Sequence, residues 1–325
     1  MEIRLRKDVG DVTLHQQHSE VMHYTTALGL AGILESNILF ATHTAFLNDN
    51  EEVAGFFDRA LPKILAKTFD TFEPSASKRR GENWRQAVIN ALKVAETTGS
   101  ENYVFSLSEP NSSFIAKNGL LSQWRGYGHD GGYAIVFDWN VLTERLIEEP
   151  KNYCDESLSW GNAEYHLDKI IPEATQQILE KISKLQSAVS AYLWQLPAGT
   201  ADLTEAAERC FEHMTNLSTF YKHVGFSEES EVRVVLSVPG KAVGPDPDKT
   251  GKLPNRPIKY FLRNGVPVPC AHLFAGGIPL PIKRVIVGPH PDKHARLRAV
   301  EILLARNGVK ANVDVSDIPY RGRGP

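Results

Sequence analysis

The chain has 325 residues, of which 42% are hydrophobic and 23% are charged, and its formal net charge is -3. This composition excludes a disordered, collagen-like or coiled-coil protein, and without an apolar run of about 18 residues we expect no membrane span. Three widely spaced cysteines argue against a disulfide framework. The basic residues among the first ten are not followed by the apolar segment of a signal peptide, so we expect a soluble, cytoplasmic protein of bacterial type.

Apolar runs alternate with amphipathic stretches in the first part of the chain. In chain order, they predict a strand at 21–25, a helix at 28–36, a strand at 38–41, a turn at 46–52, a helix through Phe56 and Ile64, a polar loop at 71–81 and a helix at 82–98. Thr25 or Thr26 can cap the first helix. Pro62 can kink the second helix.

The middle of the chain predicts a strand and then a helical hairpin. The elements expected here are a strand at 102–107, a loop at 110–119, a short helix at 120–127, a glycine turn at 128–132, a strand at 133–137, and two amphipathic helices at 172–196 and 201–223. Residues 197–200 would separate the two long helices. We therefore treat residues 1–325 as one domain with a helical insertion at 141–223.

The C-terminal part predicts strands again. They are expected at 231–238, at 257–263 and 266–271 around an Asn264-Gly265 hairpin turn, and at 284–287 and 309–315 on either side of a helix at 292–306. The last three elements form a βαβ-like unit. Together the elements predict an α+β fold with a mixed, mostly antiparallel sheet, flanking helices and an inserted helical hairpin.

Several polar residues lie where a ligand could bind. His23, Tyr24 and Thr25 end a strand before a helix N-terminus, where free amides can bind an anion. His23 can equally be a partly buried histidine bonded to the backbone. Trp124 and Tyr127 would share a helical face, from which they could clamp a planar ring or pack in the core.

Acidic residues suggest two further sites. Glu229 and Glu231 would share one face if their strand begins early, and an acid there can polarise a ribose hydroxyl or stabilise a developing cation. Alternatively, Glu231 simply pairs with Arg233. The turn with Asp49 and Glu51 could hold Mg²⁺ or could cap a helix.

Other common sites are not supported by the spacing. The glycines near 128–132 form neither a P-loop nor a dinucleotide-binding motif. His290 and His294 have no third ligand nearby and are expected on the surface, so no metal site is predicted there.

The order of short motifs resembles a large bacterial family that is catalogued as a domain of unknown function. The motifs are HYT at 23–25, FLNDNEE at 46–52, FSLSE at 105–109, QWRGYG at 123–128, GGYAIVF at 131–137, FSEESEVR at 226–233, VIVGP at 285–289 and DIPY at 317–320. The resemblance spans almost the whole chain. It implies a family and supplies no activity.

A more distant resemblance is to ADP-ribosyltransferases, and it implies an NAD site. His23 would hold the nicotinamide ribose, and Tyr127 or Tyr133 would stack on the nicotinamide. Glu231 would bind the ribose 2′-hydroxyl and stabilise the transition state, and Glu229 could orient the acceptor. Ser106 and Ser108 are similar to the Ser-x-Ser motif of one branch. The chain combines a histidine-type first motif with a Glu-x-Glu third motif.

This resemblance implies a bacterial enzyme that consumes NAD, as a toxin or a phage-defence effector. Its partners would be a small nucleotide ligand and a nucleic acid or protein acceptor. One alternative is a non-catalytic ligand-binding or sensor module of a defence system. Another is a metal-dependent nuclease that uses acidic residues, namely Asp49, Glu51, Glu52 or Glu109.

Charge is unevenly distributed along the chain. Residues 232–325 carry 16 Lys and Arg against 6 Asp and Glu, whereas residues 1–231 carry 20 against 33. The basic part could cradle a phosphate-bearing ligand or a nucleic acid. Alternatively, the two parts neutralise each other across an interface.

Overall fold

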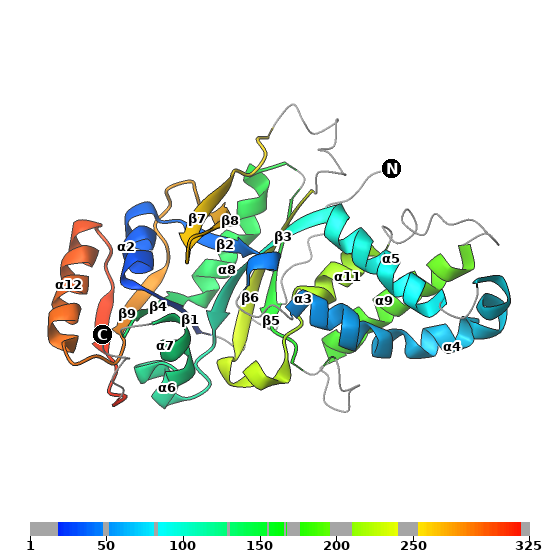
Figure 1. Ribbon diagram of the computed structural model, residues 1–325. Coiled ribbons are helices and arrows are strands. Elements are labelled where there is room, and N and C mark those ends of the chain that lie inside the picture. The colour runs from blue at the N-terminus through cyan, green and yellow to red at the C-terminus, as the bar shows by residue number, and fades with distance from the viewer. Residues whose placement is uncertain are drawn as a thin grey trace.

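A computed structural model describes residues 19–47, 52–80, 84–128, 131–154, 156–165, 167, 176–195, 210–239 and 253–319. A large sheet carries helices on both of its faces, and a second group of helices packs beside one end of it (Figure 1). Within these residues, no helix is long and apolar enough to cross a membrane.

In the described part of the chain, ten strands form one sheet in the order β10-β9-β4-β1-β3-β2-β8-β7, with β6 beside β3 and β5 beside β6. Their bounds are β1 Glu20–Thr25, β2 Leu39–His43, β3 Ser100–Ser108, β4 Tyr133–Asp138, β5 Ser157–Asn162, β6 Glu231–Pro239, β7 Ile258–Arg263, β8 Val266–Leu273, β9 Ile282–Val287 and β10 Asn312–Val315. The paired strands run antiparallel except β9 and β10, which are parallel. The predicted α+β class with a mostly antiparallel sheet is confirmed.

Strand β3 is the branch point of the sheet. On one side it pairs along its whole length with β6, up to the Ser108–Glu231 pair. On the other side, its C-terminal end pairs with β1 at Met22, and its middle pairs with β2 at Thr42 and His43. Strands β1 and β2 therefore separate beside residues 105–107.

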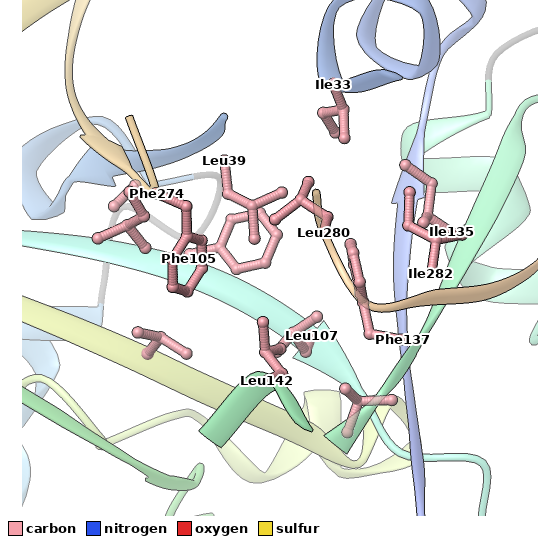
Figure 2. Close-up of a cluster of buried hydrophobic side chains, with 14 of the residues drawn as sticks. Ile33, Leu39, Phe105, Leu107, Ile135, Phe137, Leu142, Phe274, Leu280 and Ile282 are labelled. Carbon is pink, nitrogen blue, oxygen red and sulfur yellow. The ribbon is translucent and has the colours of Figure 1, made fainter. Parts of the chain in front are cut away.

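The first face of the sheet is covered by helices α2 (Ala27–Ser36), α8 (Trp139–Glu148) and α12 (Lys293–Arg306). Helix α2 begins where the Thr26 side chain accepts a hydrogen bond from the Gly29 amide, and it ends at Asn37, which adopts a left-handed conformation. Its buried Leu30, Ile33 and Leu34 pack against the main core of the protein. Figure 2 shows part of this core, including Phe105, Ile135 and Phe137 from the sheet. Burying one such side chain stabilises the fold by about 1.5–3 kcal/mol.

Two short helices, α6 (Ser113–Asn118) and α7 (Leu121–Tyr127), cover the opposite face near β1 and β4. The expectation of a loop over 110–119 is therefore wrong for 113–118. Helix α6 forms because the Ser112 side chain caps it, accepting a hydrogen bond from the Ile115 amide at 3.2 Å.

The second group of helices comes from two separate parts of the sequence. It contains α3 (Glu52–Gly55), the π-helical turn η2 (Phe56–Ala60), α4 (Leu61–Arg80), α5 (Trp84–Gly99), α9 (Gln176–Gln195) and α11 (Phe211–Ser218). The loop predicted at 71–81 is helical up to Arg80, and Phe72 within it packs on Trp194 of α9. This tertiary contact outweighs the local turn composition.

The predicted helical insertion at 141–223 is not wholly helical. It contains β5, which pairs with β6 in the sheet, and the short turn η3 (Glu149–Asn152). The predicted hairpin is present in part as α9 and α11, which contact each other. Residues 172–175, 196 and 201–209 of its predicted helices lie outside the described residues.

The C-terminal elements agree closely with the predicted ones. Asn264 and Gly265 have positive φ angles of 51° and 80° between β7 and β8, as a tight hairpin turn requires. The helix α12 joins the parallel strands β9 and β10, which confirms the βαβ unit.

A buried ion cluster fixes the chain just before β7. Arg256 Nη2 lies 2.5 Å from Glu156 Oε1, and Arg256 Nη1 lies 2.8 Å from Glu149 Oε1. The guanidinium group lies 3.9 Å from the ring centre of Tyr153. Glu149 also accepts a hydrogen bond from the Phe274 amide, so the cluster links η3 and the end of β8 to the segment just before β7.

Candidate functional site

The three strands that carry the predicted ADP-ribosyltransferase motifs are neighbours in the sheet. Strand β1 carries His23, β3 carries Ser106 and Ser108, and β6 begins at Glu231. They lie in the order β1-β3-β6, and the Met22–Ser108 and Ser108–Glu231 pairs join them in one row. Segments far apart in the sequence are thus brought within two strand spacings of each other.

His23 lies where the ladder between β1 and β3 ends. Its Nδ1–H donates a hydrogen bond to the Ser106 carbonyl at 3.0 Å, and its ring centre lies 4.5 Å from that of Phe105. Burial lowers the pKa of His23, although the bond to Ser106 opposes this shift. The ring is therefore neutral at pH 7, and Nε2 is left as a hydrogen-bond acceptor.

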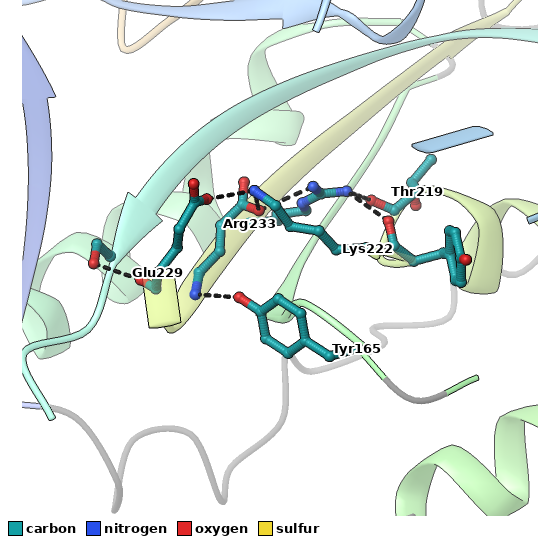
Figure 3. Close-up of polar contacts among 8 residues, drawn as sticks. Tyr165, Thr219, Lys222, Glu229 and Arg233 are labelled. Carbon is teal, nitrogen blue, oxygen red and sulfur yellow. Dashed lines mark hydrogen bonds and ion pairs between the residues drawn. The ribbon is translucent and has the colours of Figure 1, made fainter. Parts of the chain in front are cut away.

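Glu231 lies in a buried network of charged side chains (Figure 3). One of its oxygens, Oε2, is 2.9 Å from Arg233 Nη2 and 2.8 Å from Lys222 Nζ. Burial alone would raise the pKa of Glu231, but the two cations outweigh burial and lower the pKa to about 2. Glu231 is thus ionised and doubly paired, and the predicted alternative of a Glu231–Arg233 pair is confirmed.

Glu229 joins the same network from outside the strand. It is the last residue of the 3₁₀ helix η4 (Val224–Glu229), and β6 begins only at Glu231, because Ser230 between them adopts a left-handed conformation with φ 42°. The expectation that both glutamates share one strand face is therefore wrong. Their carboxylates meet instead at Lys222, whose Nζ is 2.5 Å from Glu229 Oε2. Burial raises the pKa of Glu229, and Lys222 opposes that shift.

Further contacts hold this network in place. Arg233 Nη1 donates to the carbonyl of Thr219 at 2.8 Å and to that of Tyr221 at 3.3 Å. The Glu231 amide donates to the Tyr165 hydroxyl at 2.8 Å. Ser108 Oγ donates to the Glu229 carbonyl at 2.6 Å. Figure 3 shows Arg233 of β6, Glu229 of η4 and Lys222 of the segment that follows α11 converging in this network.

No pattern in the sequence indicates that Lys222, Tyr165 or Thr219 belongs to this network. Lys222 follows α11 and comes to Glu231 through the fold, so no sequence spacing links the two. A charged residue just before a turn rich in acids is a weak signal, and it points equally well to a solvated surface.

His23 and Glu231 lie on opposite faces of the sheet. The ring of His23 contacts Phe105, whose side chain belongs to the main core. Side chains alternate along a strand, so Ser106 and Ser108 point to the other face, where the partner of Ser108, Glu231, lies with Lys222. A ligand that contacts both His23 and Glu231 would have to pass between β1 and β3 at the place where the two strands separate.

Three of the predicted aromatic residues, Tyr24, Trp124 and Tyr127, lie on the face that carries Glu231. Trp124 is fully buried, its Nε1–H donates to the Asn118 carbonyl, and it packs edge-on against Tyr24. Burial raises the pKa of Tyr24 to about 12, although its hydroxyl accepts a hydrogen bond from the Leu120 amide. Trp124 therefore offers no free face to a planar ring. Tyr127 packs, half-buried, against the same cluster.

Thr25 and Tyr133 mark the other end of β1. They form the last pair between β1 and β4, and the side chain of Tyr133 belongs to the main core, on the side of the sheet where the His23 ring lies. Tyr133 is therefore separated from Glu231 by the sheet itself.

A groove of about 500 Å³ lies beside α6, and its lining includes none of the site residues described above. Its walls include Lys117, Arg284, Asp314 and Asp317. These charges already pair, since Lys117 lies 2.9 Å from Asp317 and Arg284 lies 3.2 Å from Asp314.

Residues 48–51, which carry most of the predicted Mg²⁺ turn, lie outside the described residues. In the described part of the chain, no three His, Cys, Asp or Glu side chains are grouped so as to hold a metal ion.

Residues 123–234 match the model of a family described as a protein of unknown function (DUF2971). The match runs from Gln123 in α7 to Val234 in β6, so it contains Trp124, Tyr127 and both glutamates of the network. The expected likeness to a domain of unknown function is thus confirmed over this interval. No curated protein and no solved structure matches the chain.

Proposed function

We propose that the chain is an NAD-dependent ADP-ribosyltransferase-like enzyme of the bacterial cytoplasm, acting on a nucleic acid or protein as a toxin or a phage-defence effector. The observation that carries this proposal is the adjacency of β1, β3 and β6. His23 is bonded to the backbone of Ser106, and Ser108 is bonded to the backbone of Glu229. Three motifs that are distant in the sequence are thus physically joined.

The proposed reaction breaks the bond between the ribose C1′ and the nicotinamide nitrogen. Nicotinamide leaves with the bonding electron pair, and an oxocarbenium-like ribose is left for the acceptor to attack. A carboxylate that is ionised at neutral pH stabilises that cation, and Glu231, with a pKa of about 2, meets this requirement. His23 Nε2 would accept a hydrogen bond from a ribose hydroxyl.

The described arrangement sets two conditions for this reaction. Lys222 has to release the Glu231 carboxylate, because both cations now contact the same oxygen. NAD also has to reach from His23 to Glu231 through the place where β1 and β3 separate. Lys222 can meet the first condition, since its side chain is long and flexible.

The test is release of nicotinamide from NAD by the purified full chain, with water, bacterial lysate protein or nucleic acid as acceptor. We expect release by the wild-type protein and at least a hundredfold loss in Glu231→Gln. Glu228→Gln is the matched control, because Glu228 is an exposed glutamate of the same segment. It should retain full activity.

A second variant distinguishes loss of activity from loss of the folded structure. His23→Asn lies outside the ion network, and it should also lose nicotinamide release while keeping the melting temperature within a few degrees. No release by the wild-type protein with any acceptor would reject the enzyme. Full activity in both Glu231→Gln and His23→Asn would reject the assignment of the site.

A second candidate is a non-catalytic nucleotide-binding module, and the pairing of Glu231 favours it. A carboxylate that is shared by two buried cations acts well as a structural link between β6 and the segment after α11. This candidate predicts that NAD raises the melting temperature while no nicotinamide is released. For the metal-dependent nuclease, only Glu109 among the four acidic candidates has a described side chain, so that function stays a prediction.

A further inference from the structure

The segment 218–222 crosses the face of the sheet that carries Glu231. It begins at the last residue of α11 and lies over β3 and β6, because Phe220 packs in one small cluster with Val104 and Val235. These two valines are paired between β3 and β6 and lie on the same face as Glu231. The segment therefore connects α11 to the ion network at the start of β6.

One end of this segment holds the ion network in place. The carbonyls of Thr219 and Tyr221 accept hydrogen bonds from Arg233, and Lys222 Nζ contacts the Glu231 carboxylate. Figure 3 shows Thr219 and Lys222 at this end of the segment. A displacement of this backbone would move Lys222 away from Glu231 and would remove the acceptors of Arg233.

The other end of the segment is bonded to a buried carboxyl group. Glu96 of α5 is 4% exposed, and its Oε1 accepts hydrogen bonds from Ser218 Oγ at 3.2 Å and from Asn102 Nδ2 at 3.3 Å. Asn102 Oδ1 in turn accepts a hydrogen bond from Ser237 Oγ at 2.6 Å. The elements α5, α11, β3 and β6 thus meet at Glu96.

No cation accompanies this carboxyl group in the part of the chain that the structure describes. The charged and titratable residues on the described neighbours of α5 are Lys63, Lys67 and Asp70 on α4, Asp58 and Arg59 on η2, Glu101 and Tyr103 on β3, and Glu212 and His213 on α11. None of them bonds to Glu96, whose two donors are both neutral. Burial raises the pKa of Glu96, and the hydrogen bond from Ser218 opposes this shift.

The protonated form of Glu96 fits this environment. A carboxylate that is buried without a cation is costly, so the group keeps its proton at a pH where exposed glutamates have lost theirs. Its Oε1 then accepts from Ser218 and Asn102 without a charge. When the proton is lost to water at higher pH, a charge lies between α5 and α11 that only solvent can stabilise. The carboxylate then has to move toward solvent, and Ser218 loses its acceptor.

We propose that Glu96 is a proton-controlled anchor of the segment 218–222. The protonated anchor keeps Lys222 on the Glu231 carboxylate, and loss of the proton loosens the segment and releases Glu231. The anchor thus regulates the candidate site, and its effect on catalysis rests on the proposed function. It supplies the release of Glu231 that the proposed reaction requires, and it does so as the pH rises.

The test is amide hydrogen exchange of the full chain at pH 5 and pH 8, corrected for the pH dependence of intrinsic exchange. The amides of Thr219, Tyr221 and Lys222 are all hydrogen-bonded, so their exchange reports opening of the segment. In the wild-type protein we expect exchange about tenfold faster at pH 8, because each pKa unit corresponds to about a tenfold change in the equilibrium. Glu96→Gln keeps an oxygen acceptor but cannot ionise, so its segment should exchange slowly at both pH values.

Urea unfolding distinguishes this effect from misfolding of the variant. Because the folded-state pKa of Glu96 is raised above its ordinary value of 4.5, the wild type loses stability as the pH rises through that raised pKa. Glu96→Gln should therefore be more stable than the wild type at pH 8, which a misfolded variant would not be. Glu212→Gln is the matched control, because Glu212 is an exposed glutamate of α11. It should behave as the wild type in both measurements.

Other titratable groups lie beside the segment. Burial raises the pKa of Glu164 to about 7, and Lys181 opposes this shift. Glu229 contacts Lys222, and His223 follows it. All of these groups remain in Glu96→Gln, so a pH effect that persists in this variant would overturn the proposal. Loss of the effect in Glu164→Gln alone would assign it to Glu164 instead.

The outcomes separate the anchor from the enzyme. Exchange that depends on pH through Glu96, without nicotinamide release, would support the anchor and reject the NAD chemistry. Nicotinamide release by a wild-type protein whose segment exchanges equally at both pH values would support the enzyme and overturn the anchor.

Discussion

Replacement of Arg233 by methionine is expected to destabilise the protein strongly. Arg233 is 1% exposed, and its guanidinium group donates to Glu231, Thr219 and Tyr221. Methionine fills much of the space but donates nothing, so a buried carboxylate loses one of its two cations and two carbonyls lose a donor. Breaking a buried ion pair from one side costs about 3–5 kcal/mol.

The pKa of Glu231 leads to a similar magnitude. Its shift from 4.5 to about 2 corresponds to about 3 kcal/mol of interaction between the folded protein and the ionised carboxylate. Because the folded-state pKa is depressed, this stability is present above pH 4.5 and is lost as the pH falls toward 2. For a chain of this length, 3–5 kcal/mol lowers the melting temperature by roughly 5–8 °C.

The assay is thermal and urea unfolding followed by circular dichroism, between pH 7 and pH 3. Arg233→Met should melt roughly 5–8 °C below the wild type at pH 7. The difference should shrink on acidification, because the Glu231 carboxylate of the variant lacks one cation and takes up a proton at a higher pH than in the wild type. Arg298→Met, on the exposed face of α12, is the control and should melt as the wild type does. Equal melting of Arg233→Met and this control at pH 7 would refute the reasoning.

Three further predictions concern the rest of the fold. Glu156→Gln should lower the free energy of unfolding in urea by about 3–5 kcal/mol, because Arg256 then loses a buried partner; a change below about 1 kcal/mol would contradict it. Trp124→Ala should cost about 3–5 kcal/mol in the same assay, since the side chain is fully buried, and wild-type stability would show that its cluster is dispensable. Ser112→Ala should cost about 1 kcal/mol through loss of the α6 cap, whereas the exposed Ser113→Ala should cost nothing measurable by urea unfolding; equal effects would argue against the cap.

Local patterns predict the elements whose partners are close in the sequence. The unit of β9, α12 and β10 was predictable because apolar residues mark both strands and a helical period lies between them. The hairpin at Asn264 and Gly265 was predictable because few other residues adopt its backbone angles easily. Helix α6 was missed because six residues after a serine cap give too short a periodicity to detect.

The candidate site was predictable only where two residues share one strand. Glu231 and Arg233 are two positions apart, so the alternation of a strand places both on one face. Lys222, Tyr165 and the separation of His23 from Glu231 depend on which strands become neighbours. The residues on β1, β3 and β6 contain no information about that order when each is considered alone.

The pairing of β3 with three different strands has a consequence for synthesis of the chain. Its partners β1 and β2 precede it in the sequence, but β6 is made only after α6 to α11, on the order of ten seconds later at ordinary rates of translation. During that interval, one whole edge of an apolar strand, residues 100–108, has no partner from its own chain. Nascent chains are therefore most exposed to aggregation before residue 239 leaves the ribosome, and a chaperone that covers strand edges would act in this window.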